Sequence, residues 1–231
     1  MKVLVGTSGF SYAPWKGPFY PEKLPQKQML SYYAGRLPTV EINNTFYRLP
    51  APKMLSDWAT QVPPAFRFAV KAPQRITHQQ RLKDAGDTLA ALLAALEALG
   101  ERCGPILFQL PPFMKRDVPL LTDFLQLLPA GVRAAFEFRN ESWFVDEVYD
   151  ALRARKVALA IAESEKIDPP VVATADWGYL RLRREDYVDA DVARWAKVVT
   201  AQPWREAFVY FKHEDAGIGP KLAARMIELL G

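Results

Sequence analysis

Acidic and basic side chains occupy alternate positions in several short apolar runs of this 231-residue chain. Glu41, Lys71 and Glu137 each stand between apolar neighbours in such a run. Two carboxylates that share one site can act as general base and general acid. A lysine surrounded by other cations loses its proton more readily, and then forms a Schiff base with a carbonyl. We therefore interpret Glu41, Glu137 and Lys71 as candidate catalytic residues.

A surplus of positive charge accompanies these residues on the same strand faces. The cations are Lys71, Arg139, Arg181, Arg183 and Lys212, whereas the acids are Glu41, Glu137 and Glu163. An unpaired buried charge costs several kcal/mol, so these cations must pair, reach water or bind a ligand. We expect Arg139, Arg181, Arg183 and Lys212 to hold a phosphate or carboxylate group of the substrate.

Hydroxyl, amide and aromatic side chains extend the candidate binding site. Such groups suit sugars, bases and other flat ligands. The candidate binding residues of this kind are Thr7, Ser8, Tyr12, Trp15, Asn43, Asn44, Thr45, Tyr47, Gln109 and Trp143. For Trp15 and Trp143 the alternative is that they only cover the rim of the fold, and Phe46 is interpreted as a packing residue.

Metal ligands are scarce in the sequence. There are two histidines, His78 and His213, and neither CxxC nor HExxH occurs. We therefore predict no metal and no cofactor, although Mg²⁺ between Glu41 and Glu137 stays open. No GxSxG motif marks a nucleophilic serine, and we expect Cys103, which precedes a strand, to be structural.

Eight runs rich in β-branched or aromatic residues alternate with segments of helical composition or period. The runs cover residues 2–6, 39–46, 67–72, 105–110, 133–139, 158–163, 178–183 and 207–213. The segments between and after them cover residues 26–35, 52–61, 86–100, 118–128, 145–156, 190–201 and 220–230. The clearest is the third, in which leucines recur at helical spacing before Gly100.

This alternation predicts an α/β fold with one domain spanning residues 1–231, a single (β/α)8 TIM barrel. Eight units give about 29 residues each, which suits short loops. Pro169 and Pro170 predict an irregular connection between strands six and seven. A doubly wound sheet is the main alternative, but its glycine-rich phosphate turn is missing from the sequence. In a barrel the candidate residues would gather at the C-terminal ends of the strands, where barrel enzymes place their sites.

Several of these segments resemble one known family. They are residues 6–12, 15–17, 19–21, 40–47, 66–73, 76–78, 108–112, 136–139 and 142–144. They resemble the YecE-like family, domain of unknown function 72, which is similar to TIM barrels in fold and implies no settled activity. Two positions depart from that pattern, because Arg183 stands where many members have histidine, and Lys212-His213 stand where an Asn-Asn pair is frequent. Both departures make the barrel mouth more basic.

Composition sets broad limits on function. With 30 Lys and Arg against 26 Asp and Glu, the net charge is +4, which is mild for a protein that coats DNA. The single cysteine forms no internal disulfide, so we expect a cytoplasmic protein. The apolar run 89–96 is far shorter than the roughly 20 residues of a membrane span, and residues 3–5 are too few for a signal peptide.

These observations predict a metal-independent enzyme that acts by general acid–base chemistry on a small anionic substrate, such as a phosphorylated or acidic sugar. The alternative is a nucleic-acid-binding protein, which an open basic groove would favour. That groove would continue onto Lys16, Lys23, Arg48, Arg75 and Arg81. A third reading is a scaffold whose inner charges form closed salt bridges. Nothing in the sequence indicates a membrane partner or an oligomeric state.

Overall fold

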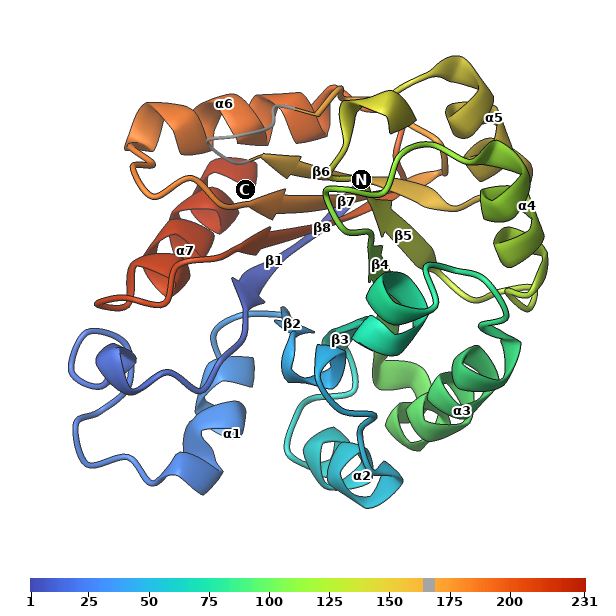
Figure 1. Cartoon of the computed structure of the whole chain (residues 1–231). Helices are drawn as coiled ribbons and strands as arrows, with labels where there is room; N and C mark the ends of the chain where they lie inside the picture. The colour runs from blue at the N-terminus through green and yellow to red at the C-terminus, as the bar shows by residue number, and fades with distance from the viewer. Residues whose placement is uncertain (164–168) are drawn as a thin grey trace.

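The computed structural model describes residues 1–163 and 169–231, which form a closed barrel of eight parallel strands surrounded by helices (Figure 1). Each strand pairs with the next, and the last strand closes the ring by pairing with the first, from Lys2 opposite Glu206 to Thr7 opposite Phe211. The predicted TIM barrel is therefore confirmed.

Strands and helices alternate around the ring, except between β6 and β7, where the described residues form no helix. The strands are β1 (Lys2–Ser8), β2 (Thr39–Ile42), β3 (Arg67–Lys71), β4 (Cys103–Gln109), β5 (Ala134–Glu137), β6 (Ala158–Glu163), β7 (Trp177–Leu182) and β8 (Glu206–Phe211). The α-helices are α1 (Met29–Ala34), α2 (Pro52–Thr60), α3 (Gly86–Leu96), α4 (Val118–Gln126), α5 (Asp146–Ala154), α6 (Asp189–Thr200) and α7 (Ile218–Leu230).

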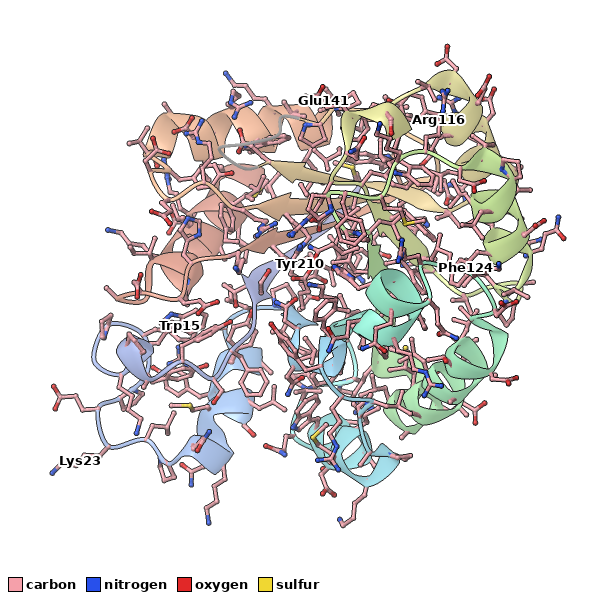
Figure 2. All side chains as sticks on the ribbon, viewed as in Figure 1. Trp15, Lys23, Arg116, Phe124, Glu141 and Tyr210 are labelled. Carbon is pink, nitrogen blue, oxygen red and sulfur yellow. The ribbon has the colours of Figure 1, made fainter. Side chains whose placement is uncertain are left out.

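Two apolar layers result from the alternation of side chains along the strands. The outer layer packs the strands against the helices, and α3 contributes Leu89, Leu92 and Leu96 to it. The inner layer fills the barrel with small residues on β3, β5 and β6, and with large rings on β7 and β8, among them Tyr210, which Figure 2 labels. Large side chains on one half thus fill the space that alanines leave on the other.

Six strands end earlier than the sequence pattern predicts, and in four of them, β2, β5, β7 and β8, the shortening leaves a polar residue of the pattern beyond the strand. β2 ends at Ile42 because the chain turns at Asn43 into a 3-10 helix over Asn44–Phe46. β5, β7 and β8 likewise end before Arg139, Arg183 and Lys212. The last polar group of each pattern therefore lies in a loop just beyond the strand, where its side chain borders the barrel mouth.

The connection between β6 and β7 was predicted to be irregular, and residues 169–176 form neither helix nor strand. The rest of that prediction falls on residues 164–168, outside the described residues. Among the helices of the described ranges, none combines the length and the apolar character that crossing a bilayer requires.

Candidate functional site at the barrel mouth

A cavity of about 450 Å³ opens at the C-terminal ends of the strands. This volume lies within the range of about 300–1,000 Å³ that is typical of pockets for small molecules. Its lining residues are Tyr12, Asn43, Phe46, Tyr47, Lys71, Gln74, His78, Gln109, Arg139, Arg181, Arg183, Lys212 and Glu214. All five cations named from the sequence line this one cavity, which we call the mouth cavity.

Arg181 is the centre of the site. Its side chain, 2% exposed, points from β7 across the barrel interior to two carboxylates on other strands. Its Nε lies 2.9 Å from Oε2 of Glu41 on β2, and Nη1 lies 2.5 Å from Oε2 of Glu137 on β5. Burial opposes the charge of Arg181, but Glu41 and Glu137 outweigh burial and raise its pKa. The guanidinium is therefore fixed in place and permanently charged.

Glu41 is fully buried, and hydrogen bonds occupy both of its oxygens. Ser8 Oγ donates to Oε1 over 2.7 Å, and the Tyr179 hydroxyl donates to Oε2 over 2.7 Å. Burial favours the neutral acid, but Arg181 and these hydrogen bonds lower the pKa of Glu41 overall. Glu41 is thus an ionised partner of Arg181 behind the mouth cavity, and does not line it.

Glu137 is 1% exposed and joins Arg181 to the cations at the mouth. Its Oε1 accepts from Gln109 Nε2 at 2.7 Å and from Arg139 Nε at 2.9 Å, while Nη1 of Arg183 lies 3.6 Å away. Burial raises the pKa of Glu137, but Arg181, Arg139 and Arg183 together hold it well below its ordinary value. One carboxylate is therefore shared among three guanidinium groups.

Lys71 differs from the arginines because no carboxylate in the described part of the chain lies within ion-pair distance of its amino group. It ends β3 with Nζ 4.0 Å from the centre of the Phe46 ring. Burial and the nearby charge of Arg181 lower the pKa of Lys71 to about 7, although Glu137 and Glu41 oppose the shift. Near neutral pH this amine exists in both protonation states, as a general acid or base requires.

The remaining cations leave the mouth cavity positively charged. Burial and Arg183 lower the pKa of Lys212, and burial and Arg181 lower that of Arg183. Nε of Arg183 is buried without a hydrogen-bond partner among the described residues. Five cations face Glu41, Glu137 and the exposed Glu214, so positive charge is in excess even when Lys71 is neutral. This balance favours an anionic ligand.

Several predicted binding residues are placed outside the mouth cavity. Trp15 is buried in an aromatic cluster against Tyr20, in the loop that follows β1 (Figure 2). Trp143 is buried on the ring of Phe138, with its indole N–H donating to the Met114 carbonyl. Both tryptophans therefore pack against other aromatic rings, and neither lines the mouth cavity.

Three small hydroxyl residues are also buried behind the mouth cavity. Thr7 bonds the Tyr33 hydroxyl and the Gly9 carbonyl, and Thr45 donates to the Lys71 carbonyl, which anchors the end of β3. Ser8 contacts the site through Glu41, as described above, and its carbonyl accepts from the Tyr12 hydroxyl over 2.7 Å. These residues shape the loops that carry the cavity lining.

The other predicted binding residues border open space. Tyr12, Asn43, Tyr47 and Gln109 line the mouth cavity, and the Tyr47 side chain is 76% exposed at its edge. Asn44 faces a neighbouring cavity instead.

Four residues of the site were not predicted from the sequence. Tyr179 lies two positions before Arg181 on the same strand face, so the alternation that indicated Arg181 also contained the signal for Tyr179. Glu214 lies in a loop, whereas His78 lies in a short π-helix over Arg75–Gln79 and Gln74 is the residue before it. No strand period marks the inward side at any of these positions. Phe46, interpreted as packing, contacts the Lys71 amine.

Comparison with known families places the chain. The model of the family described as "Protein of unknown function DUF72" matches residues 4–231. The chain belongs to the DUF72 family. YecE of Escherichia coli K12, a UPF0759 protein, is 35% identical over 116 residues, which cover 50% of this chain and 43% of YecE. YunF of Bacillus subtilis 168, also a UPF0759 protein, is 23% identical over 212 residues, 85% of this chain and 74% of YunF.

Solved DUF72 structures share the fold. A DUF72 protein of Thermotoga maritima superposes with a TM-score of 0.88 at 27% identity, and the match covers 100% of this chain and 99% of that one. A DUF72 protein of Enterococcus faecalis gives a TM-score of 0.82 at 21% identity, with 99% and 97% covered. These neighbours support the barrel architecture and leave the chemistry to be argued from the site itself.

Proposed function

We propose that this DUF72 protein is an enzyme whose barrel mouth binds a small substrate through a phosphate or carboxylate group and acts on it without a metal ion. The observation that carries the proposal is the convergence of five cations on one cavity of metabolite size. The position agrees with a general habit of TIM barrels, which frequently bind phosphate at the loops after strands seven and eight. Arg183 and Lys212 occupy those two loops.

The roles of the charged residues follow from their contacts. We assign Arg139, Arg183 and Lys212 to the substrate anion, and Arg181 to the fixed positive floor of the mouth cavity. Sequence reasoning made Glu41 and Glu137 the general base and acid, but both are buried, bonded and held ionised. They are better suited to positioning Arg181.

Lys71 is the best candidate for proton transfer. It lines the cavity, is free of carboxylate partners in the described ranges, and has a pKa near neutrality. The same properties would allow it to attack a carbonyl carbon as a neutral amine, forming a Schiff base with loss of water. Borohydride trapping with a carbonyl substrate, followed by mass spectrometry, separates the two roles, because only the covalent one marks Lys71.

The experiment measures anion binding by titration calorimetry with sulfate, inorganic phosphate, sugar phosphates and uronates. Arg183→Ala removes a charge-assisted contact worth about 1.5–3 kcal/mol, so Kd should rise by about 10- to 100-fold. Arg205→Ala is the matched control, because Arg205 is an exposed residue that precedes β8 at the opposite end of the barrel. It should leave binding unchanged.

Two outcomes would overturn the proposal. One is that none of these anions binds the wild type, or that Arg183→Ala binds as tightly as the wild type. The other is that a single-stranded oligonucleotide binds tightly with a steep salt dependence while small anions do not. Among the cations of the expected open groove, Lys23 is exposed at the outer edge of the molecule (Figure 2) and does not line the mouth cavity.

A further inference from the structure

A second cavity of about 620 Å³ adjoins the mouth cavity. It is lined by the loop after β1, by the residues that follow β2, and by side chains from α1 and α2, so it lies between these two helices, which stand apart in Figure 1. Tyr12 and Asn43 line both cavities. The two cavities are therefore neighbours, with Tyr12 and Asn43 at their boundary.

The second cavity differs from the mouth cavity in its chemistry. Its polar lining is mainly uncharged, with the amides of Gln26, Asn43, Asn44 and Gln61, and one cation, Lys27. An amide offers both hydrogen-bond donors and an acceptor, as do the hydroxyl groups of a sugar. The mouth cavity thus holds most of the charge, whereas the second cavity offers hydrogen-bond donors and acceptors.

These amides retain unused hydrogen-bonding capacity. Oδ1 of Asn43 is buried without a partner among the described residues, an arrangement that is unfavourable until a donor arrives. Nε2 of Gln26 makes a long contact of 3.3 Å with Ser11 Oγ, and Nε2 of Gln61 donates to the Asp57 carbonyl. A ligand with several hydroxyl groups could form hydrogen bonds with these unsatisfied amide groups.

The aromatic residues of the second cavity favour a sugar over a nucleobase. Trp58 meets Phe10 edge to face at 88° between the ring planes, and stacks on Phe68 at 22°. One face of the Trp58 indole is therefore covered by Phe68, and among the described residues that line this cavity no two rings are stacked in parallel to form a slot for a flat base. Aromatic rings in this arrangement, beside several amides, are compatible with the face of a sugar ring.

We infer that the substrate is a sugar derivative in which the anionic group occupies the mouth cavity and the uncharged, hydroxyl-rich part occupies the second cavity beside Asn43 and Asn44. This inference rests on the proposed function, because it takes the mouth cations as the anion site. It adds the class of the substrate and a binding site for its uncharged part.

The test compares inorganic phosphate with aldose, ketose and disaccharide monophosphates, and with AMP, by titration calorimetry. Asn44→Ala and Gln26→Ala remove exposed amides of the second cavity and should leave the fold intact. Gln202→Ala is the matched control, because Gln202 lies beyond α6 and contacts the Val198 carbonyl. We expect at least one sugar phosphate to bind about tenfold or more tightly than phosphate, and each cavity variant to lose about three- to tenfold of that gain.

Binding of inorganic phosphate tests the proposed function. The gain, which is the affinity for a sugar phosphate relative to that for phosphate, tests this inference. Supporting results are a gain that falls in Asn44→Ala and Gln26→Ala, with phosphate binding unchanged in both and with Gln202→Ala like the wild type. The inference is overturned if no sugar phosphate in the panel exceeds phosphate, if the gain survives both variants, or if AMP binds more tightly than every sugar phosphate. If one of these three outcomes occurs while Arg183→Ala loses phosphate binding, the proposed anion site is supported and the inference about the sugar is overturned.

Discussion

Anion binding should be coupled to proton uptake by Lys71. In the free protein its pKa of about 7 leaves about one tenth of the molecules protonated at pH 8 and about nine tenths at pH 6. A unit negative charge about 4 Å from the amine attracts it by about 4 kcal/mol at an effective dielectric constant near 20, a factor of about a thousand in proton affinity. Lys71 should therefore be fully protonated in the complex at both pH values.

The expected uptake is about 0.9 proton per anion at pH 8 and about 0.1 at pH 6. Sulfate is the appropriate probe, because it does not titrate in this range. Calorimetry in buffers with different ionisation enthalpies measures the uptake directly. The apparent affinity for sulfate should correspondingly be greater at pH 6 than at pH 8.

Two variants isolate the source of the proton. Lys71→Met keeps the length of the side chain and removes the amine, so uptake at pH 8 should disappear. Lys212→Met removes the other lysine of the mouth cavity, whose pKa is also lowered, and should leave most of the uptake in place. Absence of uptake in the wild type at pH 8, or an equal uptake in Lys71→Met, would refute the reasoning.

Three further predictions concern the buried network and the packing residues. Arg181→Met leaves Glu41 as a buried charge without an ionic partner among the described residues, and removes from Glu137 one of its three guanidinium partners. It should lower the free energy of unfolding by about 3–5 kcal/mol in urea titrations. The pKa of Glu137 is held below its ordinary value of 4.5, so its contribution to stability is present above that pH and is lost as the pH falls. Glu137→Gln should therefore reduce the acid-side dependence of thermal stability, and an unchanged pH profile would count against the pairing. Trp143→Phe removes the indole hydrogen bond to Met114 but keeps a ring on Phe138, and should cost about 1 kcal/mol while sulfate binding stays within twofold of the wild type.

The alternation of side chains along the strands is the pattern that predicts both the fold and the inward-facing residues. The barrel interior admits side chains from alternate positions only, so the polar face of each run indicates that Glu41, Lys71, Glu137 and Arg181 point inward. The fold followed from the same regularity, because eight such runs separated by helical segments satisfy the barrel pattern.

The sequence does not show which charged residues of the site form ion pairs with one another. Alternation shows that Arg181 faces inward, but it does not show that one guanidinium meets carboxylates 140 and 44 positions earlier in the chain. These contacts decide that Glu41 and Glu137 are ionised partners and leave Lys71 as the titrating group. Residues outside the strands, such as His78, follow no strand period, and the buried position of Trp143 depends on tertiary packing with Phe138.

The contacts of Arg181 also join parts of the chain that lie far apart in the sequence, which has a consequence for folding. Bringing β7 to β2 closes a loop of most of the chain, and long loops carry the largest closure entropy. Until the last strands dock, Glu41 and Glu137 have no common partner and the mouth cations are dispersed along an open sheet. An anion bound as proposed would recognise the closed ring alone, so it should slow unfolding of the completed barrel without accelerating its assembly.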